Sequence, residues 1–178
     1  MNRKTIIYLS IILFIFPFVP VVMATFIRLV GSVSGCSLAG DVCSLFGVNM
    51  GDMLKHWVSM SWGAIYWALL PMISGGLLTL FVLDNFRQRF LIGGVAPAVS
   101  LVAVILLPVF LVVFSAHDKC MINEGGVGDC VVWGTSMKDT FHTAMVAPWF
   151  VMFAVPISVM WIILVSVSAF FLGRYKKA

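Results

Sequence analysis

Four long runs of apolar residues constrain what this chain can fold into. They cover about residues 5–30, 57–83, 90–116 and 140–173. A helix that spans a bilayer needs about 20 apolar residues to cross about 30 Å of hydrocarbon, so each run is long enough. A helix also satisfies its own backbone hydrogen bonds in lipid, which makes helices the expected structure. Only 10% of the residues are charged, whereas soluble domains carry about 25%.

These runs predict an all-α fold, a four-helix transmembrane bundle that forms one integral membrane domain over residues 1–178. The lipid bilayer is therefore the first predicted partner. The fourth run is longer than a bilayer requires, and we expect it to tilt, to bend near Pro148 or Pro156, or to extend past the lipid. The first run contains Val22-Met23-Ala24, which resembles a signal-peptidase site. It stays apolar beyond that point, which favours a retained helix.

The positive charges are distributed unevenly among the segments that join these runs. Seven of the eleven Lys and Arg residues lie at the N-terminus, in the short connector 84–89 or at the C-terminus. Lys and Arg near helix ends favour the cytoplasmic side of a membrane. We therefore predict that both termini are cytoplasmic and that the two long loops, about 31–56 and 117–139, lie outside the cytoplasm. A bacterial inner membrane is the expected location.

All four cysteines lie in the two long loops, Cys36 and Cys43 in the first and Cys120 and Cys130 in the second. Disulfides persist outside the cytosol, in the bacterial periplasm or the secretory lumen. We therefore expect two disulfides. One pair in each loop is the favoured pairing, although four cysteines allow three connectivities. Their expected role is to order short polar loops that have little core of their own.

The layout of four spans, cytoplasmic termini and a cysteine pair in each outer loop resembles that of the DsbB family of quinone-coupled thiol oxidases. The resemblance would imply that the cysteines pass electrons to a quinone, with Arg28 as a candidate cation beside it. That family carries Cys-x-x-Cys in its first loop, whereas six residues separate Cys36 from Cys43. Close spacing is what lowers one thiol pKa and promotes exchange. At a helix end, Arg28 can also simply extend to the lipid headgroups.

The three histidines, His56, His117 and His142, all lie at the predicted outer ends of the spans. Met53 precedes His56 by three residues and Met145 follows His142 by three, so each pair shares a helix face. Imidazole with thioether is a ligand set for haem or for Cu(I), which makes these two pairs the candidate metal ligands. His117 is a candidate binding residue. Methionine also fills gaps in helix packing, and that is the simpler interpretation.

Neither the tryptophans nor a comparison of the first two spans with the last two suggests a further site. Four tryptophans suit an outer interfacial belt: Trp57, Trp62, Trp133 and Trp149. Beyond the order of span, loop and span, we expect no internal repeat with matching residues in the two halves.

The features that the sequence lacks narrow its function. No catalytic motif is present, and no span has the central charge that is usual in ion pathways. Basic residues are not clustered as nucleic-acid binding requires. We therefore predict a non-enzymatic subunit or accessory protein of a larger membrane assembly, which contacts other membrane subunits through its spans and outer loops. The alternatives are a redox protein, either a thiol oxidase or a haem or copper carrier, and an immunity-type protein that binds a pore-forming toxin.

Overall fold

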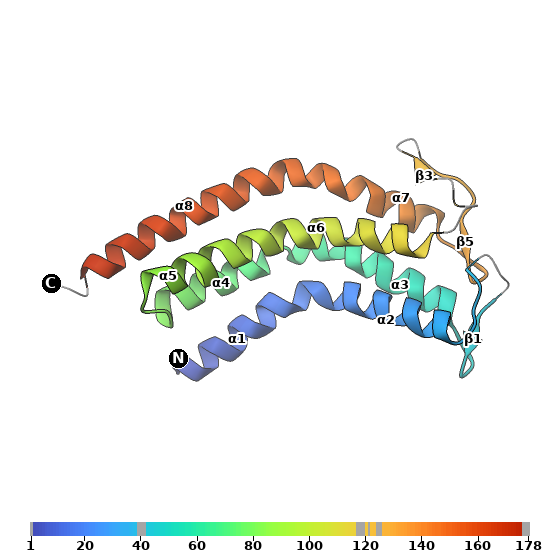
Figure 1. Cartoon of the computed structure of the whole chain (residues 1–178), viewed down its shortest axis with the longest axis horizontal. Coiled ribbons are helices and arrows are strands. Elements are labelled where there is room, and N and C mark those ends of the chain that lie inside the picture. The colour runs from blue at the N-terminus through green and yellow to red at the C-terminus, as the bar shows by residue number, and fades with distance from the viewer. Residues whose placement is uncertain (1, 39–41, 117–119, 121, 124–125, 176–178) are drawn as a thin grey trace. The chain divides into compact units, whose positions relative to one another are not determined.

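The structure, a computed structural model, describes residues 2–38, 42–116, 120, 122–123 and 126–175 and is built almost entirely from helices (Figure 1). Among these residues, three helical stretches are long and apolar enough to cross a membrane: Arg3–Val33, Phe86–Ser115 and Lys138–Leu172. They correspond to the first, third and fourth predicted runs. The prediction of an all-helical chain is confirmed, with three helices that could span a membrane, whereas the four-helix transmembrane bundle stays a prediction.

The second predicted run, 57–83, is divided into two helices. Helix α3 (Met50–Gly63) ends before a 3₁₀ turn, η2 (Ala64–Trp67), and α4 (Leu70–Phe81) follows as a shorter apolar helix. Pro71 lies in the first turn of α4. Proline is tolerated there because the N–H groups of that turn have no partner within the helix, and it disfavours helical geometry in the residue before it. The division of this run therefore follows from its proline.

Prolines also mark the breaks in the first and fourth runs. Pro17 lies in the 3₁₀ turn of the first run and Pro148 in that of the fourth, as expected for one of the two proposed bends, whereas Pro156 lies inside a helix. The elements are α1 (Arg3–Ile15), η1 (Phe16–Phe18), α2 (Val19–Val33), α7 (Lys138–Val146), η4 (Ala147–Phe150) and α8 (Val151–Tyr175).

The helical stretch that corresponds to the third run, Phe86–Ser115, is continuous but not uniform. It consists of α5 (Phe86–Gln88), η3 (Arg89–Val95) and α6 (Ala96–Ser115). The middle segment, η3, is a π-helix. A π-helix is wider than an α-helix and is rare outside sites where packing or function requires it.

Three short antiparallel hairpins connect the helices. They are β1 (Ser44–Leu45) with β2 (Val48–Asn49), β3 (Ile122–Asn123) with β4 (Gly126–Val127), and β5 (Val131–Val132) with β6 (Thr135–Ser136). The first hairpin leads into α3 and the third into α7.

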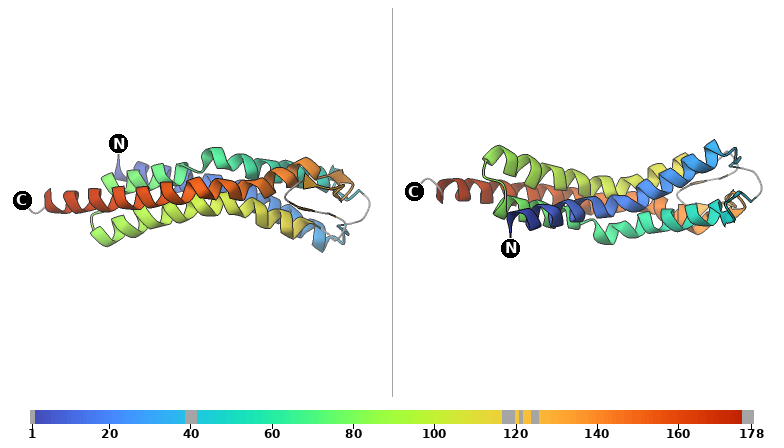
Figure 2. Two further views of the ribbon diagram at one scale, coloured as in Figure 1. Left: turned by 90° about the horizontal axis from the view of Figure 1, so that it is seen from above. Right: turned by 90° about the horizontal axis from the view of Figure 1, so that it is seen from below.

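The helices and hairpins pack as two compact units. Unit 1 contains Met1–Pro17, Tyr66–Val104 and Phe150–Ala178, and unit 2 contains Phe18–Ile65 and Ile105–Trp149. All three hairpins belong to unit 2, and they lie together at one end of it (Figures 1 and 2). Every predicted span contributes residues to both units, so the single transmembrane domain stays a prediction.

In unit 1, small residues allow the helices to approach closely. Gly75 of α4 packs against Pro97 and against the Gly93 carbonyl of η3. The Ser74 hydroxyl donates a hydrogen bond of 2.8 Å to the Ser10 carbonyl of α1. Small residues and hydroxyl groups at helix contacts are the usual means of helix association in lipid, where apolar burial gives no driving force.

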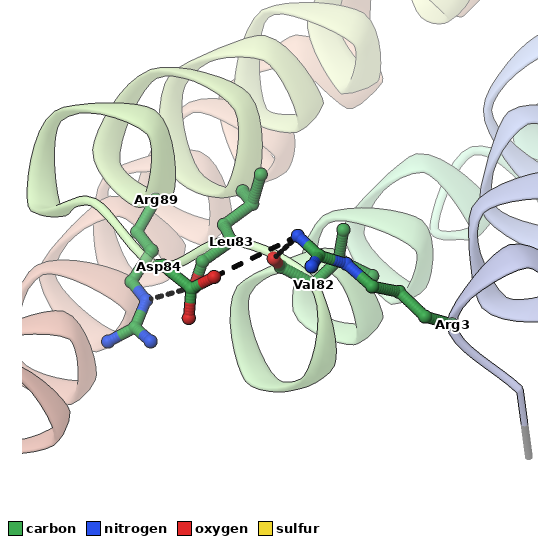
Figure 3. A network of polar contacts seen from close by, with 5 residues as sticks. All are labelled: Arg3, Val82, Leu83, Asp84 and Arg89. Atoms are coloured by element: carbon green, nitrogen blue, oxygen red, sulfur yellow. Dashed lines mark hydrogen bonds and ion pairs between the residues drawn. The ribbon is translucent and has the colours of Figure 1, made fainter. Parts of the chain in front are cut away.

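Two arginines donate hydrogen bonds to the backbone carbonyls that follow the end of α4 (Figure 3). Arg3 Nη2 donates to the Val82 carbonyl at 2.9 Å and lies 3.8 Å from Asp84 Oδ2, while Arg89 Nε donates to the Leu83 carbonyl at 2.7 Å. The last carbonyls of a helix have no partner within it, and cations near that end are favourable. These contacts hold the start of α1 and the connector at the end of α4.

Candidate functional site

Two hairpins of unit 2 share one sequence pattern. The segment CSLFGVNMGD covers residues 43–52, and CVVWGTSMKD covers residues 130–139. A cysteine, an aromatic residue, a glycine, a methionine and an aspartate recur at identical spacing. We call residues 43–50 the Phe46 hairpin and residues 130–137 the Trp133 hairpin. The expectation that the two halves have no matching residues is therefore wrong.

The two hairpins also share their backbone. Phe46 and Trp133 have φ values of 53° and 51°, and the glycines that follow them, Gly47 and Gly134, have values of 78° and 75°. In each hairpin the methionine N–H donates to the cysteine carbonyl at 2.9 Å. Two-residue turns with positive φ at both positions are of type I′, and Asn-Gly or Asp-Gly is the usual sequence. A bulky aromatic residue in that conformation is uncommon and costs about 1–3 kcal/mol.

A disulfide fixes the beginning of each hairpin. Cys36 is joined to Cys43, with 5.9 Å between the Cα atoms, and Cys120 is joined to Cys130, with 4.6 Å between them. The expected disulfides are thus present, one in each loop. Cys43, Cys120 and Cys130 are buried in the core of unit 2. Thiol exchange requires access to a sulfur atom, so this burial favours a structural role.

Trp133 is fully buried, with 0% of its surface exposed. It lies against Gly31 of α2 so closely that a Cβ atom at residue 31 would overlap the indole ring. Its backbone N–H donates to the Leu38 carbonyl at 3.5 Å. The Arg28 guanidinium carbon lies 5.6 Å from the ring centroid. The indole therefore holds its hairpin on the end of α2 and is not part of an interfacial belt, which corrects the expectation from sequence.

Phe46 occupies the matching position but is 96% exposed. Its neighbours Val42 and Val48 are exposed as well. The strained backbone at Trp133 is compensated by burial of the indole, whereas the same backbone at Phe46 presents the ring to the surroundings. The hairpin thus places an apolar ring at the tip of an ordered turn, where nothing in the described chain covers it.

Contacts join the Trp133 hairpin to the residues on either side of the Phe46 hairpin. Thr135 Oγ1 of the Trp133 hairpin donates to Asp52 Oδ1, at the start of α3, at 2.8 Å. Gly51 packs on the same threonine, and Gly134 packs on Val42, next to Cys43. The Phe46 hairpin is therefore bound at its base by a disulfide and by the other hairpin.

Arg28 lies between the Trp133 indole and the Phe114 ring, which lines an apolar groove. The groove has a volume of about 580 Å³ and lies between α2 and α6. It is lined by Val21 and Thr25 of α2 and by Leu107, Phe110, Val113 and Phe114 of α6. The Arg28 guanidinium carbon lies 5.3 Å from the centroid of the Phe114 ring.

The predicted metal ligands are not brought together by any contact that the structure shows. Met53 and Met145 pack against the core of unit 2, as side chains that fill gaps would. His56 is exposed and its ring meets that of Trp57 edge to face, while His142 is half-buried. Within the described ranges, no group of three or more His, Cys, Asp or Glu side chains is placed to hold a metal ion. Haem or copper binding stays a prediction, and His117 lies outside the described residues.

Reasoning from sequence did not single out Phe46 or Gly31, and it assigned Trp133 to an interfacial belt and not to a hairpin. The signal that identifies the two aromatic residues was available, because an aromatic residue before glycine, three residues after a cysteine, occurs in both loops. Gly31 has no such signal, since its role depends on where the indole lies.

The chain matches no protein-family model, no curated protein and no solved structure. Its function must therefore be inferred from the geometry of these two hairpins and the groove.

Proposed function

We propose that this protein is a small accessory protein or subunit of a larger assembly in a bacterial inner membrane, and that the Phe46 hairpin is its docking point for a partner protein outside the cytoplasm. The single observation that carries the proposal is the exposure of Phe46, 96%, on a turn that is strained and fixed at its base. Aromatic residues, phenylalanine included, are enriched in protein interfaces relative to the rest of the surface. A rigid hairpin loses little conformational entropy when it binds.

The proposed membrane arrangement has four spans, with both termini in the cytoplasm. Helix α4 together with residues 57–69 supplies the second span, beside the three long apolar stretches. An even number of spans returns the C-terminus, with Arg174, to the side of Arg3. The positive-inside tendency supports that side as the cytoplasm. Both disulfides then lie in the oxidising periplasm.

The redox alternative has less support. Three of the four disulfide sulfur atoms belong to buried residues, and six residues separate Cys36 from Cys43. Both features oppose rapid thiol exchange, which needs an accessible and activated thiol.

A toxin bound by an immunity-type protein would be one kind of partner for the Phe46 hairpin.

The substitution Phe46→Asn tests the docking proposal. It creates the Asn-Gly pair that type I′ turns prefer, so the hairpin should become more stable while the aromatic contact is lost. Native membranes that contain wild-type or variant protein are crosslinked and then solubilised gently, and the co-purified proteins are identified by mass spectrometry. We expect a specific partner with the wild type and a loss of at least about tenfold with the variant, since interface hot spots exceed about 2 kcal/mol.

Phe171→Ala is the matched control, because Phe171 is an exposed phenylalanine of α8, outside the hairpin region. This variant should keep the partner. The proposal is wrong if Phe46→Asn retains the same partner at the wild-type level, or if the wild type is a lone protein after crosslinking in its native membrane.

A further inference from the structure

The groove between α2 and α6 has the two properties of a site for an amphiphile. Its lining is apolar apart from the Thr25 hydroxyl, and its volume of about 580 Å³ lies within the usual range of ligand sites. Phe110 and Val113 in this lining are exposed to the surroundings of the helix. A groove of this kind in a membrane-spanning helix pair is open to lipid chains.

A cation lies beside one ring of the groove lining. Arg28 follows Thr25 by three residues on α2, so the two side chains share one face of the helix. The guanidinium carbon is 5.3 Å from the Phe114 ring, which itself lines the groove. Among described residues, the structure gives Arg28 no carboxylate partner, and its Nε atom is buried without a hydrogen-bond acceptor.

An unpaired guanidinium that is partly removed from water favours an anionic partner. Arginine binds phosphate through two parallel N–H···O hydrogen bonds, and it is less strongly hydrated than lysine. Arg28 lies five residues before the end of α2, and an arginine near the end of a membrane helix usually extends its guanidinium to the lipid headgroups. The rings of Phe114 and Trp133 hold the guanidinium in place.

We infer that this groove binds one chain of an anionic phospholipid, with the lipid phosphate at Arg28. The charge of Arg28 selects the headgroup and the apolar lining accepts the chain. This inference does not depend on the docking role of Phe46, because none of the groove residues belongs to the Phe46 hairpin.

The test compares phosphatidylglycerol with phosphatidylcholine as probes for the full-length protein. Native mass spectrometry of detergent-solubilised protein, titrated with each lipid, measures how much of each stays bound. We expect the wild type to retain one phosphatidylglycerol in preference to phosphatidylcholine. Arg28→Gln should lower that preference about fivefold, the effect of one cationic contact near a membrane surface, and Arg28→Lys should retain part of it.

Two further variants separate a lipid site from a structural role of Arg28. Val113→Trp fills the groove but leaves Arg28 in place, and it should abolish the retained lipid. Phe26→Leu alters an exposed ring of α2 that is not part of the groove lining and leaves Arg28 in place, and it should retain the phosphatidylglycerol preference. Each variant is first shown to unfold at the wild-type temperature in phosphatidylcholine nanodiscs.

Equal retention of the two lipids by the wild type would overturn the inference, as would wild-type binding by both Arg28→Gln and Val113→Trp. If Arg28→Gln does not fold, the wild-type comparison and Val113→Trp decide the question.

Discussion

At the scale of single residues, Gly31 and Trp133 show how closely unit 2 is packed. The indole ring occupies the space that any side chain at residue 31 would need. Gly31→Ala should therefore destabilise the protein by about 1–3 kcal/mol, the usual cost of overpacking a core. Thermal unfolding of purified protein in detergent measures this effect.

Gly63→Ala is the control for that substitution. Gly63 is also helical, at the end of α3, and among the described residues no atom beyond its chain neighbours and its own helix backbone lies within 4 Å of the place where its Cβ would be. Alanine favours helix by about 0.5–1 kcal/mol over glycine, so this variant should be as stable as the wild type or more stable. Equal losses in the two variants would mean that the indole does not occupy the position described.

A second residue-scale prediction concerns a hydrogen bond in unit 1. Trp161 Nε1 donates to the Gly93 carbonyl of the π-helix η3 at 2.9 Å. Trp161→Phe removes the donor and should cost about 0.6 kcal/mol, the average for a hydrogen bond between membrane helices. The exposed Trp149 offers the comparison, because Trp149→Phe should change the unfolding temperature less.

At the scale of elements, the disulfides should contribute stability and resist reduction. Replacing Cys120 and Cys130 by alanine opens a link between residues 10 apart in sequence. Loop-closure entropy predicts a loss of about 2–3 kcal/mol, measured by unfolding in detergent.

Because Cys130 is fully buried, a mild reductant should leave this disulfide intact in the folded protein and open it after unfolding. Alkylation with a mass-tagged maleimide measures both states. Rapid reduction in the folded protein would favour the redox alternative.

The elements also show which parts of the fold the sequence can predict. Helices over three of the apolar runs follow from their length and hydropathy, and the break at Pro148 follows from proline geometry. The π-helix η3 does not, because Gly93 and Gly94 permit several backbones and their packing against Thr79 and Val165 selects one. Likewise, the sequence identifies the cysteines of the loops. It does not show that Trp133 is buried and Phe46 exposed, because the two rings follow the same sequence pattern and their burial depends on the tertiary structure.

At the scale of the whole molecule, the distribution of charge and the cysteines should determine its orientation. The cluster of Arg3, Asp84 and Arg89 lies at the ends of α1 and α4, and both disulfides lie in the loops that follow α2 and α6. Cationic helix ends favour the cytoplasm and disulfides favour the periplasm, so both features support one orientation.

The side of the membrane on which the hairpins lie can be measured by labelling single introduced cysteines with a membrane-impermeant maleimide. Ser136→Cys places an exposed thiol in the Trp133 hairpin, and Gln88→Cys places one in the connector. In cells whose outer membrane is permeabilised and whose inner membrane is intact, we predict that the residue 136 thiol is labelled. The residue 88 thiol should be labelled only after the inner membrane is permeabilised as well. Labelling at residue 88 while the inner membrane is intact, with residue 136 protected, would contradict the orientation and with it the docking role of Phe46.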